Sequence, residues 1–348
     1  MADSRRSERP PGPSPAAPAR WRSARETAGP RDVRVAVTGT PGPLRDAIAA
    51  HLTESAGTVS VRVLDAHMPR AGQRLRDVDV VVLVAASLET GTRRLTPEET
   101  ARILRAATAV PRLVLVSSAM VYGADPANDL PLAEDAPLLA EERGIAGDLL
   151  DIERLVAGQR AQGLTVLRPA MLVGRGADTV FVRHFSAPLL LQVQGSTPAW
   201  QFCHVDDLLS AVGYAVAGRV EGAVTVGCEG WLAQETVESI AGLRRLVLPA
   251  ALAFGTAERL HRLGVSPAPA GELRYVAYPW VVPSTRLLTA GWRPTHDNAA
   301  ALTELLAAAE AAGGRRGLRE TPLSAAGAAV AMVGTAALLR QARRRRRG

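Results

Sequence analysis

The residues best suited to bind a ligand lie in a glycine turn at positions 38–42, between a strand-like run and a helix-like run. Valines at alternating positions of 33–37 predict a short strand, and Pro43 has the fixed φ of a first helical residue. Backbone N–H groups at such a helix start bind anions, and a pyrophosphate is the anion expected here. The residues assigned to this cofactor-binding turn are Thr38, Gly39, Thr40, Pro41 and Gly42.

Asp65 is the second candidate for ligand binding. It follows the strand expected at 59–64, and an acid about 20 residues beyond such a turn holds the ribose hydroxyls of a dinucleotide. A carboxylate at this place favours NAD over NADP because it repels a 2′-phosphate. The alternative is that Asp65 is a solvated acid at the end of a strand.

The elements that must position these residues alternate between strands and helices. Apolar runs at 80–86, 113–116 and 165–167 are typical of buried parallel strands, and a helix is expected at 148–162. This alternation predicts an α/β fold with a Rossmann-type doubly wound parallel sheet. Only about a dozen residues follow Asp65 before the next apolar run, too few for another unit. One strand–helix unit is therefore expected to be missing after the second strand.

Composition changes along the chain predict its domain organisation. Residues 1–32 are rich in Pro, Ser, Ala and Arg and are expected to form a disordered tail. Residues 33–312 form the expected Rossmann domain, with a smaller substrate-side lobe from about 174 onward. A linker at 313–322 and an apolar, Ala-rich helix with a polyarginine end at 323–348 complete the chain.

Charge and residue usage exclude several functions. The formal net charge is +7, but residues 1–32 contribute +3 and residues 340–348 contribute +6, so the body carries −2. A nearly neutral body argues against a specific nucleic-acid partner. The two cysteines are too few for a disulfide framework or a zinc cluster. All 41 basic residues are arginine, so chemistry that needs a lysine is excluded.

Six short stretches match the motifs of one known family in the order in which that family has them. They are residues 37–42, 79–86, 117–123, 167–174, 202–207 and 291–294. On these residues the chain resembles the extended short-chain dehydrogenase/reductase family, also called the NAD-dependent epimerase/dehydratase family, over about positions 33–310. The resemblance implies a Rossmann fold and an NAD cofactor packed against the small pair Ala85 and Ala86. Arg168 either lines that cofactor or pairs with a carboxylate at a strand end.

The chain departs from the family where the chemistry lies. The family uses a Tyr as acid/base and a Lys four residues later, with a Ser that aligns the substrate oxygen. Ser118 matches that Ser, but Ile145 and Leu149 occupy the Tyr and Lys positions. Arg45 replaces the third glycine of the turn, and Trp200 stands where nucleotide-sugar enzymes often keep an Arg.

These departures lead to three functional hypotheses, and the sequence leaves open whether the chain is an enzyme. The first is an NAD(P)-binding protein that is non-catalytic or uses non-standard chemistry. The second is a membrane-associated oxidoreductase or epimerase for a nucleotide-sugar or lipid-linked substrate, with a substitute acid such as Asp148, Glu142 or His204. The third is a structural adaptor that binds no nucleotide, which is favoured if Arg45 fills the pyrophosphate site. If a cofactor binds, a Gly39→Val variant is expected to abolish its binding. A homodimer is a further expectation.

The stretch from His204 to Asp207 has two interpretations. His204, Asp206 and Asp207 could form a metal or acid/base set. Alternatively, Asp206 caps the helix that follows, and His204 packs at the lobe boundary. The second interpretation is preferred, and no metal is assigned.

The C-terminal segment predicts contact with a membrane surface. Residues 323–339 carry no charge, and six arginines follow within 340–347. A helix lying in the interface with its arginines on anionic headgroups fits this pattern better than a span, and a soluble helix remains a third alternative. The chain begins without a signal peptide, so the expected location is the cytoplasm, with attachment to the cytoplasmic face of the membrane.

Overall fold

A computed structural model of the chain describes residues 33–55, 58–65, 75–89, 93–141, 143–160, 162–174, 177–264 and 269–311. The expected N-terminal tail, the linker, the apolar C-terminal helix and its polyarginine end lie outside the described residues, as does Glu142. No described helix has both the length and the apolar character needed to cross a bilayer.

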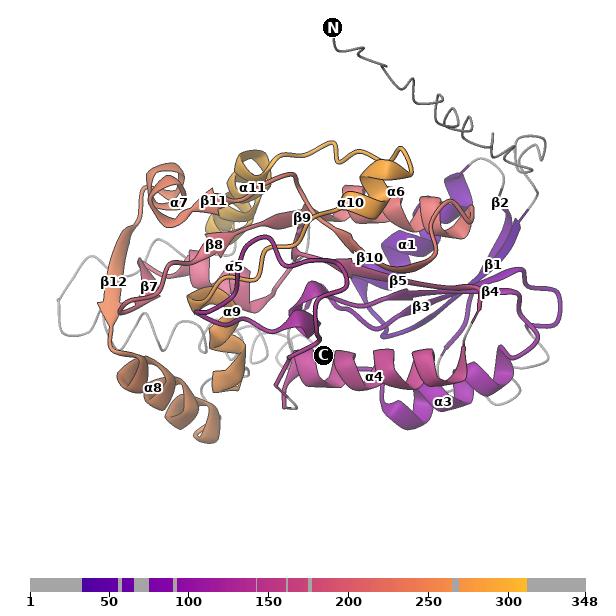
Figure 1. Cartoon of the computed structure of the whole chain (residues 1–348), viewed down its shortest axis with the longest axis horizontal. Helices are drawn as coiled ribbons and strands as arrows, with labels where there is room; N and C mark the ends of the chain where they lie inside the picture. Colours follow the sequence, from indigo (N-terminus) through magenta and orange to yellow (C-terminus); the bar gives the residue numbers. More distant parts are fainter. Residues whose placement is uncertain are drawn as a thin grey trace, which may run out of the picture. The chain divides into compact units, whose positions relative to one another are not determined.

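A parallel sheet of six strands forms the centre of the fold (Figure 1). Its order is β10-β5-β4-β3-β1-β2, and every neighbouring pair is parallel. The strands are β1 (Val33–Gly39), β2 (Thr58–Val63), β3 (Val80–Val84), β4 (Arg112–Val116), β5 (Leu164–Pro169) and β10 (Gly222–Val226). The strand β3 is fully buried because both faces of the sheet are covered, which explains its unbroken run of apolar residues.

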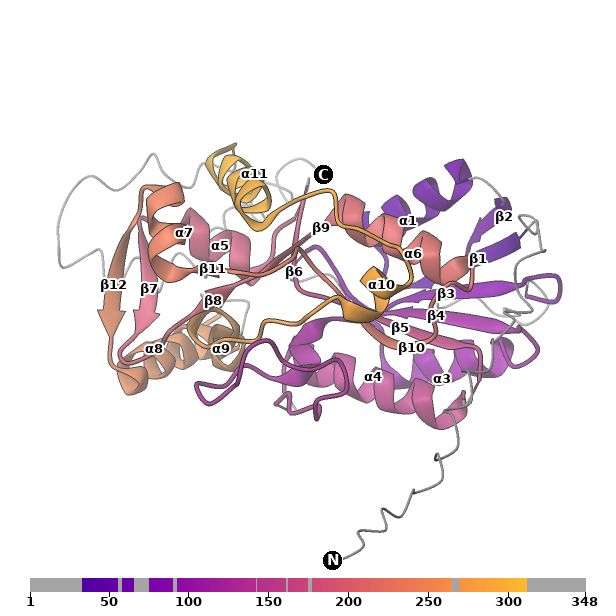
Figure 2. The same ribbon diagram turned by 45° about the horizontal axis from the view of Figure 1, so that its top comes forward.

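Helices cover both faces of this sheet (Figures 1 and 2). The helices α1 (Pro43–Glu54) and α6 (Val205–Val216) pack together on one face, and α3 (Pro97–Ala106) and α4 (Ile145–Gln159) pack together on the other. The Rossmann-type doubly wound sheet predicted from the sequence is confirmed. Among the described residues no strand pairs with the outer edge of β2, as expected for a sheet that lacks one unit after its second strand.

The order of the strands reverses at β1, which has β2 on one side and β3 on the other. At such a switch point the connecting loops diverge and leave a crevice at the carboxyl ends of the strands, where ligands of open α/β sheets bind. In this sheet the switch point is flanked by the turn after Gly39 and by the residues that follow Val84.

The second half of the chain builds smaller sheets beyond those carboxyl ends. The pairs are β6 (Met171–Val173) with β9 (Phe202–His204), β7 (Leu189–Val193) with β12 (Arg244–Leu248), and β8 (Ala199–Trp200) with β11 (Leu232–Ala233). The remaining helices are α5 (Val180–Ser186), α7 (Gln234–Ala241), α8 (Ala250–Arg262), α9 (Arg274–Ala277), α10 (Thr285–Thr289) and α11 (Asn298–Ala311), and the 3₁₀ turns are η1 (Ala119–Tyr122) and η2 (Ala270–Leu273). Within this half, residues 205–226 return to the main sheet as α6 and β10.

A cluster of aromatic rings fills the lobe around Trp200. The Trp200 ring lies 5.3 Å from His184 and 5.0 Å from Phe185, and its indole N–H donates to Gln234 at 2.8 Å. Trp200 is buried, and its side chain offers no charge to a phosphate.

The burial of His184 leads to a pH prediction. Complete burial lowers the pKa of His184 from 6.5 to about 4, so the ring is neutral in the folded protein near pH 7. Below pH 6.5 the unfolded chain binds a proton that the folded chain does not. The stability from this group is therefore complete above pH 6.5 and is lost as the pH falls toward 4, by about 3 kcal/mol in all. Denaturant unfolding of wild type and His184→Phe across this pH range should give a shallower decline for the variant, and parallel curves would contradict the assignment.

Candidate functional site

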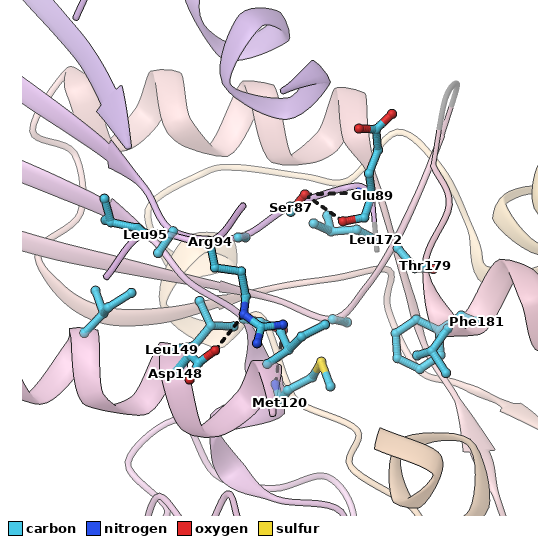
Figure 3. A pocket seen from close by; sticks show the side chains of 17 residues that line it. Ser87, Glu89, Arg94, Leu95, Met120, Asp148, Leu149, Leu172, Thr179 and Phe181 are labelled. Carbon is cyan, nitrogen blue, oxygen red and sulfur yellow. Dashed lines mark hydrogen bonds and ion pairs between the residues drawn. The ribbon is translucent and has the colours of Figure 1, made fainter. Parts of the chain in front are cut away.

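A cleft of about 70 Å³ lies where the carboxyl ends of β3 and β4 meet the start of α4 (Figure 3). Its wall is largely apolar, with a few polar side chains interspersed. Apolar residues of the lining are Ala85, Ala86, Leu95, Met120, Ile145, Leu149, Ile152, Ala170, Leu172, Val180 and Phe181. Polar residues of the lining are Ser87, Glu89, Arg94, Ser118, Asp148 and Thr179. The cleft therefore includes the predicted small pair and the predicted Ser.

Hydrogen bonds hold the glycine turn against the end of β3 and against Ala85, which lines the cleft. The Thr40 N–H donates to the carbonyl oxygen of Val84 at 2.7 Å, and its hydroxyl donates to the carbonyl of Ala85 at 3.2 Å. At Gly39, with φ of 120°, a Cβ would lie 2.2 Å from the Val84 oxygen. The sheet itself thus requires a glycine at position 39, whether or not a cofactor binds beside it.

The start of α1 keeps part of an anion-binding site. Gly42 is the N-cap, with φ of 140°, and Pro43 is the first helical residue, as predicted. Pro41 and Pro43 have no N–H, so the donors near the helix start are the N–H groups of Gly42, Leu44 and Arg45, which lack intrahelical partners. The turn therefore offers fewer donors to a pyrophosphate than a turn without proline.

Arg45, which occupies the third glycine position, brings a cation to the same helix start. Its side chain is only 15% exposed, and its guanidinium lies 3.1 Å from the carboxylate of Asp46. A positive charge at a helix N-terminus is disfavoured by the dipole unless an anion is nearby. Asp46 provides one such anion, and a bound pyrophosphate would provide another.

Asp65 lies just beyond β2, next to the carboxyl end of β1. The preceding residue, Leu64, donates its N–H to the carbonyl of Val37 at 2.9 Å, which holds the chain beside β1 to this point. The Asp65 side chain is exposed. This is the side of the switch point where a ribose would lie, and the role of Asp65 remains a prediction.

Ser118 follows β4 and caps η1. Its hydroxyl accepts the N–H of Met120 at 3.2 Å and lies 3.5 Å from the carbonyl oxygen of Pro169. The side chain is buried but lines the cleft. The local contacts show a structural role, and contact with a ligand oxygen stays a prediction.

The first turns of α4 carry the residues at the expected Tyr and Lys positions. Ile145 and Leu149 both line the cleft, so apolar side chains stand where the resemblance places the acid/base and its partner. Asp148 also lines it, and its carboxylate lies 2.6 Å from Arg94 Nε on the loop before α3 (Figure 3). Both side chains of this ion pair are about half exposed, and Arg94 is the only arginine among the described residues that line the cleft.

Arg168 forms an ion pair with a carboxylate on a helix, and not with the carboxylate at a strand end that was one of its two expected partners. Its guanidinium donates to Glu153 of α4 at 2.7 and 3.1 Å and to the Tyr122 hydroxyl at 2.8 Å. Both charged side chains are less than a tenth exposed. The Arg168 side chain lines a separate groove of about 650 Å³ between α4 and β10 and does not line the cleft. Its contact with a cofactor stays a prediction.

The stretch from His204 to Asp207 caps α6, but not as the sequence predicted. The helix begins at Val205, so the N-cap is His204, whose Nδ1 accepts the N–H of Asp206 at 3.2 Å. The expectation that Asp206 is the cap is therefore wrong by two positions. Asp207 is buried and accepts hydrogen bonds from Thr295 and His296.

Sequence reasoning missed Glu272, a buried carboxyl of η2. Its Oε1 lies 3.7 Å from the place a Cβ would take at Gly144, the N-cap of α4. Burial raises the pKa of Glu272, and its Oε2 has no hydrogen-bond partner among the described residues. Nothing in the local sequence could identify it, because the contact joins segments more than 120 residues apart.

The parallel sheet with helices on both faces defines a Rossmann-type α/β protein, and a cleft lies at the carboxyl ends of its strands. The chain belongs to the NAD dependent epimerase/dehydratase family, whose model matches residues 44–227, more than half of the sequence. The match begins after the glycine turn, so it does not include Gly39 and Gly42.

Among curated proteins, the chain is similar to a reductase and to a protein without an assigned activity. It is 34% identical over 144 residues to a 3-diazoavenalumate denitrifying reductase of a Streptomyces species, which covers 39% of this chain and 47% of the relative. It is 32% identical over 131 residues to an uncharacterised protein of Mycobacterium tuberculosis, which covers 36% of this chain and 35% of the relative. The matches thus span less than half of either relative.

Solved structures show the same fold at low sequence identity. The UDP-glucose 4-epimerase of Thermus thermophilus, solved as a complex with NAD, superposes with a TM-score of 0.56 at 18% identity. The alignment covers 80% of this chain and 99% of that one. This likeness supports the fold assignment alone.

Proposed function

We propose that this protein binds NAD or a related dinucleotide in the crevice at the switch point and lacks the proton relay of its family. The observation that carries the proposal is the cleft at the carboxyl ends of β3 and β4, where Ile145 and Leu149 meet Ala85, Ala86 and Ser118. The family membership and the NAD-bound structural relative support the cofactor. Apolar side chains at positions 145 and 149 support the absence of the relay, because neither can move a proton.

The absence of a relay limits the chemistry that the cleft can perform. A reductase or epimerase must give a proton to, or take one from, the substrate oxygen when hydride moves, and the Tyr does this in the family. Without it, the protein is best suited to hold the dinucleotide for sensing, scaffolding or regulation. Turnover with a carbonyl substrate that disappears in Ser118→Ala would overturn this part of the proposal.

Asp65 gives the sharpest test of the cofactor proposal. Titration calorimetry of the full chain with NAD should show binding in the micromolar range, and Asp65→Asn should weaken it about tenfold, the value of one hydrogen bond to a charged group. NADPH should bind wild type more weakly than NAD, and the variant should reduce this difference. Asp77→Asn is the matched control, because Asp77 is also exposed but lies before β3, at the amino ends of the strands. Equal NAD affinity in both variants would contradict the assigned role of Asp65.

A second candidate is an oxidoreductase or epimerase that uses Asp148 as a substitute acid. The observation in its favour is that Asp148 lines the cleft, one residue before the lost Lys position. His204, by contrast, does not line it. The Streptomyces relative, named as a reductase, also supports hydride transfer. Incubation of the full chain with NAD and UDP-glucose, or with NADH and a pool of carbonyl compounds, tests this candidate, and any turnover should be lost in Asp148→Asn.

We also propose that residues 323–348 attach the protein to an anionic membrane surface at the cytoplasmic face. Five arginines in a row at 343–347 should contribute about 1 kcal/mol each on vesicles that contain phosphatidylserine. Co-sedimentation of the full chain should therefore fall more than tenfold when these arginines are replaced by glutamine. Vesicles of phosphatidylcholine alone are the control, and equal sedimentation with both lipids would contradict electrostatic attachment. A homodimer remains a separate expectation that gel filtration of the full chain tests.

A further inference from the structure

Two histidine rings stack on each other between α6 and the loop that leads into α11. The ring centroids of His204 and His296 lie 3.7 Å apart, with an angle of 27° between the planes. His204 is buried and His296 is half-buried. None of the residues involved lines the cleft, so the cluster is separate from the proposed dinucleotide site.

Each ring donates one N–H to a carboxylate, and this fixes its other nitrogen as an acceptor. His296 Nδ1 lies 3.0 Å from Asp207 Oδ2, and His204 Nε2 lies 2.9 Å from Glu304 Oε2 on α11. His204 Nδ1 accepts a backbone N–H, so the tautomer inferred from the network carries its proton on Nε2. By the same reasoning the lone pair of His296 is on Nε2. A carboxylate behind each imidazole is the arrangement typical of histidines that bind metals.

Asp206 adds a carboxylate beside these rings. Its Oδ2 lies 3.6 Å from His204 Nδ1, and its side chain is 70% exposed. Three possible metal-binding atoms lie within 4.8 Å of one another, one each from His204, Asp206 and His296. We propose that these three residues bind a divalent transition-metal ion, with water in the remaining coordination positions.

The geometry favours a particular class of ion. Two imidazole nitrogens and one carboxylate suit Zn²⁺, Co²⁺ or Ni²⁺, whereas Mg²⁺ and Ca²⁺ prefer oxygen ligands alone. Metal–nitrogen bonds of about 2.0–2.1 Å require the donor atoms to approach by roughly 1 Å. The exposed Asp206 side chain can approach the ion freely. The half-buried His296 ring must turn out of its stack on His204, so that the in-plane lone pairs of both rings point at one ion. Coordination of His204 Nδ1 replaces its hydrogen bond from the Asp206 N–H.

Such an ion would join segments that are far apart in the chain. His204 and Asp206 belong to the start of α6, and His296 belongs to the loop before α11. Glu304, which holds His204, lies on α11 itself. A ligand that binds only the folded protein raises its stability, so the ion would hold α11 against α6.

Titration of the untagged full chain with Co²⁺ tests this proposal, after treatment with a chelator and dialysis. We expect one ion per chain, with visible absorption bands typical of nitrogen-coordinated Co²⁺, and a rise of several degrees in the thermal midpoint with Zn²⁺. Asp206→Asn and His296→Asn should each weaken binding at least tenfold. The Asn at position 296 can still donate an N–H to Asp207, so the variant removes the lone pair but keeps the local structure.

The matched control is Glu98→Gln, which removes an exposed acid from the first turn of α3. It should leave the Co²⁺ affinity and spectrum unchanged. The proposal is overturned if Co²⁺ binds only at millimolar concentration, or if both site variants bind it as well as wild type. Either outcome is independent of the dinucleotide site, because none of these residues lies in the cleft.

Discussion

Gly39→Ala is expected to destabilise the protein by about 3–5 kcal/mol, even without any ligand. The added Cβ would lie 2.2 Å from the Val84 oxygen, the acceptor of the Thr40 N–H, so β1 and β3 would have to separate at the switch point. The positive φ of 120° adds strain for any other residue. Denaturant unfolding of the two proteins measures the difference directly.

Gly195→Ala is the control for this prediction. Gly195 also has a positive φ, of 78°, but a Cβ there meets nothing within 4 Å. Gly195→Ala should lower the free energy of unfolding by only about 1 kcal/mol, which is the strain of a left-handed conformation for alanine. If both variants lose the same free energy of unfolding, the positive φ of Gly39 explains its effect and the clash with the Val84 oxygen does not. Loss of NAD binding in Gly39→Val therefore cannot identify the cofactor site, because the sheet would fail first.

Glu153→Ala is expected to cost about 3 kcal/mol, because it leaves the Arg168 guanidinium buried without its carboxylate. The two side chains are 5% and 9% exposed, and their charged atoms approach to 2.7 Å. In this variant the Arg168 guanidinium keeps, among the described residues, only its hydrogen bond to the Tyr122 hydroxyl. Urea denaturation at neutral pH gives the free energy of unfolding.

Asp151→Ala on the same helix provides the comparison. Its ion pair with Arg154 spans 3.7 Å, and both side chains are more than half exposed. Pairs of this kind contribute at most about 1 kcal/mol, and much of that is screened by salt. If Asp151→Ala costs as much as Glu153→Ala, burial is not the reason for the stability of the Arg168 pair.

The main sheet could be predicted because its signals are local. Alternating valines before the glycine turn and the unbroken apolar run of β3 specify strands, and the short spacing after Asp65 removes one unit. The lost Tyr and Lys positions could also be predicted, since a chain without lysine cannot supply the pair. Ile145 and Leu149 line the cleft, and their place at the Tyr and Lys positions stays a prediction.

Other contacts could not be predicted because they join segments that are distant in the sequence. Glu272 meets the start of α4, and His296 stacks on His204 from 92 positions away. From the sequence, Arg168 had two alternative partners, a cofactor and a carboxylate at a strand end, and nothing indicated Glu153, which lies 15 residues before it. A histidine at an N-cap is also uncommon, which is why Asp206 was the preferred cap.

Binding of NADH to the full chain, followed by nicotinamide fluorescence, tests the central claim most directly. The account predicts a saturable signal with one site and a dissociation constant in the micromolar range, reversed by excess NAD and weakened by Asp65→Asn. A signal that stays linear in nucleotide up to millimolar concentration would contradict it. The fold would then have kept the crevice of its family without the cofactor.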